Sequence, residues 1–248
     1  MDVAVRLLNA IVMIALPLVL GAILVRRYGV RWSLFGWGAV TFVGSQIVHL
    51  PLLQGLTLGL RDATMLRTHA LVTNAIVLGL AAGVCEEGAR YLGYRFLVPD
   101  ARTWAKALML GAGHGGMEAI LLGGLSGVAT LHLIASGTWA PETLALAAAP
   151  ATARALPPGP MIPLLGALER VFALADHLAL SVMVLQTFVR RSWRWLLAAI
   201  AWHALLDGTA VYGAGTVSAV TLEGILAVFA LASVGIVAGL RPHAAPAA

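Results

Sequence analysis

The chain has 248 residues, of which 60% are hydrophobic and 11% are charged, and its mean hydropathy is +0.91. Soluble domains carry roughly 25% charged residues, so this composition excludes a soluble globular domain and indicates an integral membrane protein. The net charge of +5 does not indicate nucleic-acid binding, because the basic residues lie in short segments between apolar runs, as membrane topology requires.

Seven apolar runs are long enough to cross a hydrocarbon core of about 30 Å as helices. In chain order they cover residues 7–25, 32–54, 69–97, 104–134, 162–188, 194–212 and 217–240. The predicted fold class is therefore all-α, a polytopic bundle of about seven transmembrane helices in one domain over 1–248, expected in a bacterial plasma membrane. The alanine- and proline-rich segment 137–162 predicts an external loop with a short interfacial helix around 141–149.

Basic residues are distributed unevenly between the two sides of this predicted bundle. One side carries ten of them: Arg26, Arg27, Arg31, Arg95, Arg102, Lys106, Arg190, Arg191, Arg194 and Arg241. The other side carries four: Arg6, Arg61, Arg67 and Arg154. Since cytoplasmic connections are enriched in lysine and arginine, we expect the N-terminus outside and the C-terminus in the cytoplasm.

Ionisable residues interrupt the apolar runs in short clusters. These are Glu86-Glu87 with Arg90, His114 with Glu118, Glu169-Arg170, Asp176-His177, His203 with Asp207, and Glu223. A charge at mid-membrane costs about 2.5–3.5 kcal/mol, so such groups must face one another or water rather than lipid. At about 1.5 Å per residue, four of the predicted helices each bring a carboxylate or imidazole to about 12–16 Å from the basic side. We therefore expect one hydrated chamber that opens toward the cell interior.

Three of these clusters follow one another in a characteristic order. They are Glu86-Glu87-Gly88-Ala89-Arg90, then Gly111-Ala112-Gly113-His114 leading to Glu118, then His203-Ala204-Leu205-Leu206-Asp207. Over about residues 69–212 this order resembles the YhfC-type membrane peptidases, distant relatives of the CAAX prenyl endopeptidase and bacteriocin-processing intramembrane proteases. The glutamate-to-arginine spacing is one residue shorter than in the wider group, and Leu110 replaces an aromatic residue, which favours the YhfC-like branch.

The resemblance implies an intramembrane endopeptidase that uses glutamate-activated water to cut a membrane-embedded or lipidated peptide, with no cofactor required. Glu86 or Glu87 would be the general base, and His114 would orient the water. His203 would stabilise the tetrahedral intermediate, and Asp207 would orient the His203 ring. The expected supporting residues are Arg90, Glu118, Asp176 and His177.

Three other interpretations stay open. A zinc-dependent protease would hold Zn²⁺ with His114, His177, His203 and Glu87, although the sequence contains no HExxH stretch. A proton- or ion-coupled transporter also uses buried carboxylates and histidines, but the inverted repeats common in transporters are not visible here. A catalytically silent scaffold predicts that all the polar groups pair with one another and leave no pocket.

Overall fold

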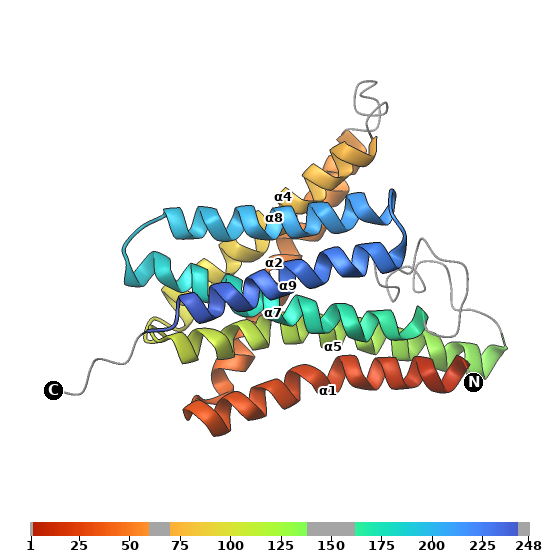
Figure 1. Cartoon of the computed structure of the whole chain (residues 1–248), viewed down its shortest axis with the longest axis horizontal. Coiled ribbons are helices and arrows are strands. Elements are labelled where there is room, and N and C mark those ends of the chain that lie inside the picture. Colours follow the sequence, from red (N-terminus) through yellow and green to blue (C-terminus); the bar gives the residue numbers. More distant parts are fainter. Residues whose placement is uncertain (1, 60–69, 138–161, 243–248) are drawn as a thin grey trace.

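The computed structural model describes residues 2–59, 70–137 and 162–242, and these residues form an all-helical bundle (Figure 1). Its long helices are α1 (Asp2–Tyr28), α2 (Trp32–Gly59), α4 (Ala70–Leu92), α5 (Trp104–Ser136), α7 (Ile162–Val189), α8 (Arg194–Ala214) and α9 (Ala219–Gly239). A short π-helical turn, η1 (Gly93–Leu97), continues α4. In these described residues, seven helices are long and apolar enough to cross a membrane.

The predicted all-α fold with seven spans is confirmed. Capping residues fix several of the observed helix ends. The Thr103 hydroxyl accepts a hydrogen bond from the amide of Lys106 at the start of α5, and Gly137 ends that helix with φ of +66°. Ser218 caps the start of α9 in the same way. Apart from its first and last residues, the loop expected over 137–162 lies outside the described residues, as does the interfacial helix expected around 141–149.

Two central helices, α5 and α7, hold the bundle together. Helix α5 packs against α1, α2 and α7, while α7 also contacts α8 and α9, and α4 lies along α8. Glycines permit the closest approaches: a Cβ at Gly111 would lie 2.6 Å from the carbonyl oxygen of His177, and one at Gly83 would lie 2.7 Å from that of Ile200. Small residues at such contacts are typical of helix packing in lipid.

The two ends of the bundle differ. We call the end where α1, η1 and α7 finish, and where α2, α5 and α8 begin, the basic end, because its connections carry the ten basic residues listed above. It lies at the left of Figure 1, and the opposite end is called the far end. A hydrophobic core cluster occupies the basic end and includes Leu24, Phe35, Tyr94, Leu110, Leu185 and Leu196. The expected orientation in the membrane stays a prediction.

Candidate functional site

The ionisable clusters meet inside the bundle, next to a cavity of about 280 Å³. Six helices contribute to its lining: α2, α4, α5, α7, α8 and α9. Its histidines and carboxylates are His49, Glu86, Glu118, Glu169, Asp176, His177, His203 and Asp207. The four helices that the sequence predicted to converge therefore do so, around a pocket that a fully self-paired scaffold would lack.

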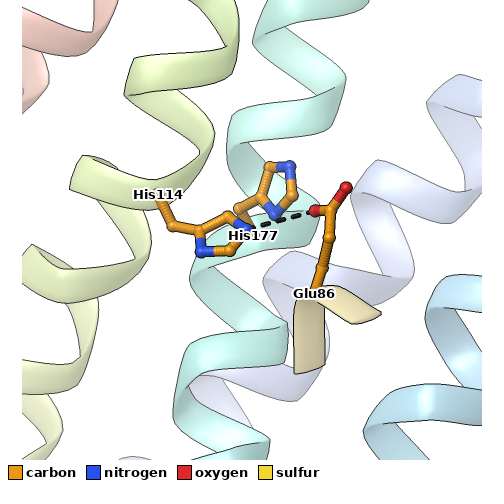
Figure 2. Close-up of side chains that lie close together, drawn as sticks. All are labelled: Glu86, His114 and His177. Atoms are coloured by element: carbon orange, nitrogen blue, oxygen red, sulfur yellow. Dashed lines mark hydrogen bonds and ion pairs between the residues drawn. The ribbon is translucent and has the colours of Figure 1, made fainter. Parts of the chain in front are cut away.

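The centre of the site is a cluster of Glu86, His114 and His177 (Figure 2). They come from α4, α5 and α7, and each offers one ligand atom within 4.8 Å of the others. Nε2 of His114 lies 3.1 Å from Oε2 of Glu86, and all three residues are buried. The side-chain amide of Gln46 donates a hydrogen bond of 3.2 Å to the other carboxylate oxygen of Glu86. Carboxylate and imidazole donors at this separation are suited to a single bound cation.

The tautomer of His114 follows from its neighbour on α2. The hydroxyl of Thr41 donates its only hydrogen to the carbonyl of Gly38 at 2.6 Å. With this hydrogen on Gly38, the Thr41 oxygen, 2.9 Å from Nδ1 of His114, accepts a hydrogen bond from that nitrogen. A neutral His114 consequently has no hydrogen on Nε2. Its lone pair faces the carboxylate of Glu86, so a proton or a metal ion is needed between these two acceptors.

His203 is held by the neighbouring glutamate. Arg90 donates to both carboxylate oxygens of Glu87, and neither side chain has any solvent exposure. Because arginine stays protonated, Glu87 is a carboxylate and accepts the Nδ1 hydrogen of His203 at 2.8 Å. Nε2 of His203 then points to the cavity side, 3.9 Å from Oε2 of Glu86. Adjacent glutamates thus occupy different surroundings: Glu86 lines the cavity and Glu87 lies behind it.

Both ring nitrogens of His177 are already engaged. Nδ1 lies 3.0 Å from a guanidinium nitrogen of Arg90, which can only donate, so Nδ1 is the acceptor. Nε2 therefore carries the hydrogen and donates it to Glu118 at 2.8 Å. Glu118 in turn accepts a hydrogen bond of 2.5 Å from Arg170. A continuous line of charge-assisted bonds runs from Arg170 to the Arg90–Glu87 pair and fixes the orientation of the His177 ring.

Two further acidic residues line the same cavity. Oδ2 of Asp207 lies 3.5 Å from Nε2 of His203, and its side chain is 34% exposed, more than the other acidic partners in this network. Asp176 accepts a hydrogen bond of 2.5 Å from the hydroxyl of Ser233 on α9. The structure thus brings every predicted site residue into or beside one cavity, with Glu87 and Arg90 as the inner pair.

Three site residues on α2 had no role in the sequence-based prediction. Thr41 fixes the His114 ring, Gln46 contacts Glu86, and His49 lines the cavity with no hydrogen-bond partner for either ring nitrogen in the described part of the chain. A signal was present in the sequence: Thr41, Ser45 and His49 are four residues apart and share one face of an otherwise apolar helix. Thr41, Ser45 and His49 are buried, whereas Gln46 is partly exposed.

Known proteins are similar to this chain over most of its length. The model of a family described as "YhfC intramembrane metalloprotease" matches residues 12–229. The chain belongs to the YhfC family. The uncharacterized membrane protein YhfC of Bacillus subtilis (strain 168) is 35% identical to the chain over 224 residues, which cover 84% of each protein. No solved structure matches the chain.

Membership confirms the predicted resemblance to YhfC-type proteins, whereas the more distant similarity to CAAX endopeptidases stays a prediction. With seven helices able to span a membrane in the part of the chain that the structure describes, and a bacterial membrane protein among its relatives, the chain is an integral protein of the bacterial plasma membrane. The family's description names a protease that uses a metal. It gives no support to the cofactor-free mechanism that the sequence favoured.

Proposed function

We propose that the protein is a zinc-dependent intramembrane endopeptidase whose metal is held by Glu86, His114 and His203. The observation that carries this proposal is the convergence on Oε2 of Glu86 of two histidine nitrogens, Nε2 of His114 at 3.1 Å and Nε2 of His203 at 3.9 Å. When Nδ1 of His114 donates to Thr41, Nε2 and the Glu86 carboxylate are both acceptors and repel each other unless a cation lies between them. A proton shared by the same atoms would correspond to the glutamate-activated mechanism, so metal content decides between the two versions.

The hydrogen bonds of His177 and His203 indicate which of the two is the third metal ligand. Metal-bound histidines almost always donate their other ring hydrogen to a carboxylate, carbonyl or similar acceptor. His203 has this arrangement toward Glu87, and His114 has it toward Thr41. His177 could bind a metal only by giving up its bond to Arg90 or to Glu118. We therefore assign His177 a positioning role, and we assign the metal-binding carboxylate to Glu86 rather than to Glu87.

The remaining cavity residues support peptide hydrolysis. Zinc bound at this position would act as a Lewis acid toward the scissile carbonyl and an attacking water. Asp207, the most exposed of the nearby carboxylates, would accept the proton of that water and pass it to the leaving amine. The apolar lining, which includes Leu78, Phe172 and Leu206, would hold the side chains of an apolar peptide.

Metal analysis of the purified protein tests the proposal. We expect about one zinc per chain, as in other catalytic sites with three protein ligands. His203→Ala should lose the metal and His177→Ala should keep it, which separates the two possible third ligands. Cleavage of membrane peptides should stop after chelation and return with zinc. Metal-free protein that still cleaves in the presence of a chelator would establish the glutamate mechanism instead.

A further inference from the structure

In the described residues, the cavity extends from the site mainly toward one end of the bundle. On α4 its lining consists of Leu78, Ala82 and Glu86, and no residue beyond Glu86 takes part. On α7 the lining ends at Leu180, and on α8 it begins at Trp202, two turns into the helix. Because α4 and α7 run toward the basic end and α8 runs away from it, most of the described lining lies between the site and the far end, and Leu180 reaches one turn past His177 toward the basic end.

The basic end is closed by tight packing. Directly behind Glu86 lie Glu87, Arg90 and Tyr94, and none of the three is exposed. The Tyr94 hydroxyl lies 2.9 Å from the hydroxyl of Ser181 on α7, which itself donates 2.8 Å to the carbonyl of Ala107 on α5. These bonds join three helices across the bundle. Among the described residues, no lining of the cavity passes this layer.

The charge distribution tells which side of the membrane the cavity reaches. The basic end carries ten basic residues, and such connections remain in the cytoplasm. We propose that the site is entered from the extracytoplasmic side and takes an apolar peptide segment of an exported or membrane-anchored chain. This direction is opposite to the chamber opening expected from the sequence. The identity of the substrate rests on the proposed protease function, whereas the side of entry does not.

The lining supports this choice of occupant. Between the site and the far end the cavity is walled by Leu53, Leu78, Phe172, Leu206, Val211 and Leu226. Glu86, His177 and His203 lie at its inner end, while Glu169, Arg170 and Asp207 line the outer part together with the apolar side chains. A peptide that enters from the far end would place apolar side chains against this wall before its backbone reaches the histidines. Burial of each large apolar side chain would contribute about 1.5–3 kcal/mol, which favours apolar segments over polar ones.

Single-cysteine labelling in intact cells tests the side of entry. The chain has one cysteine, Cys85, so Cys85→Ser gives a background without thiols. Ala173→Cys and Ala210→Cys place thiols in the cavity wall. Thr216→Cys marks the exposed α8–α9 connection at the far end, Asp100→Cys marks the exposed basic end, and Ala199→Cys is a fully buried control. The probe is a charged, membrane-impermeant maleimide.

We expect the two cavity thiols and the far-end thiol to react in intact cells, and the basic-end thiol to react only after the cells are opened. The cavity thiols should react more than about tenfold faster than the buried control, because a thiol must reach water to ionise. Cavity thiols that react only in opened cells would overturn the proposal. The same holds for cavity thiols that react from neither side, and for a pattern in which the basic-end thiol is the one labelled in intact cells.

Two reporter proteins then test the substrate. Each has a single membrane span and the same apolar cleavable segment, placed near the outer surface in one and near the inner surface in the other. We expect cleavage of the outer reporter alone. Cleavage of the inner reporter, alone or equally, would overturn the substrate assignment. If neither is cut while the labelling pattern is as expected, the protease function fails and the side of entry stands.

Discussion

The two halves of this bundle are built from the same helices but use them differently. At the basic end the helices enclose a layer of fully buried side chains, among them Tyr94, Met109 and Leu110. Toward the far end the same helices line a cavity with ionisable walls. The charged residues lie where the two halves meet: Glu87 and Arg90 pair within the packed layer, while Glu86 and Asp207 face the cavity. A membrane protein can therefore keep charges at mid-depth without exposing them to lipid.

Glu86 and Glu87 show this difference within one peptide unit. The largest effect should come from Glu86→Gln, which removes a charged metal ligand. We expect its affinity for zinc to fall by more than about 100-fold, beyond the 10–100-fold typical of losing an outer partner, and cleavage to be abolished. The folded protein should persist, because a glutamine amide can donate to the unprotonated His114 nitrogen. Titration of metal-free protein with zinc measures the affinity, and binding equal to that of the wild type would contradict the ligand assignment.

Glu87→Gln should damage the packed half instead. It leaves the guanidinium of Arg90 without its carboxylate in a place with no solvent exposure. Removing one partner of a buried ion pair costs about 3–5 kcal/mol, so the free energy of unfolding should fall by that amount. Denaturant unfolding in detergent micelles, compared with Glu86→Gln as the matched control, measures it. Equal stability of the two variants would remove the distinction between the two glutamates.

Thr41→Val tests whether the His114 ring is positioned from the packed side. Valine has nearly the same shape but cannot accept the Nδ1 hydrogen of His114. Loss of such an outer partner weakens metal binding by about 10–100-fold, and Thr41→Ser should restore it because serine keeps the acceptor. Zinc titration of both variants provides the measurement. If Thr41→Val binds zinc as tightly as Thr41→Ser, the tautomer of His114 is set in some other way.

Much of the fold could be predicted from the sequence because its physical cause is local. Apolar runs of about twenty residues must become spanning helices, and α2, α5 and α8 begin at the predicted residues Trp32, Trp104 and Arg194. The meeting of the charged clusters could also be predicted, since isolated charges at mid-membrane are too costly. The family resemblance rested on the order of these same clusters.

Other features depend on how the helices pack, and the sequence does not record that. Glu86 and Glu87 are adjacent, so only their neighbours Arg90 and His203 reveal which one faces the cavity. Neutral polar residues such as Thr41 cost little in a helix and therefore stand out weakly from an apolar background. The direction of the cavity follows from side chains of six helices together and has no signature in any one segment.

The smallest expected effect tests how tightly α4 packs against α8 beside the cavity. The cavity lies on one face of α4, while Gly79 and Gly83 on another face stay against the backbone of α8. A methyl group at Gly83 would lie 2.7 Å from the carbonyl oxygen of Ile200, whereas one at Gly88 would meet nothing within 4 Å. Gly83→Ala should therefore lower the free energy of unfolding by about 1–3 kcal/mol, as overpacking does.

Gly88→Ala is the matched control on the same helix. It should raise the free energy of unfolding by about 0.5–1 kcal/mol, because alanine loses less backbone freedom in a helix than glycine. Denaturant unfolding of both variants in micelles gives the comparison. If Gly83→Ala is tolerated as well as Gly88→Ala, α4 and α8 can separate beside the cavity, and the far half of the bundle is loose throughout. If the two differ in sign, the cavity is a hollow bounded by rigid walls.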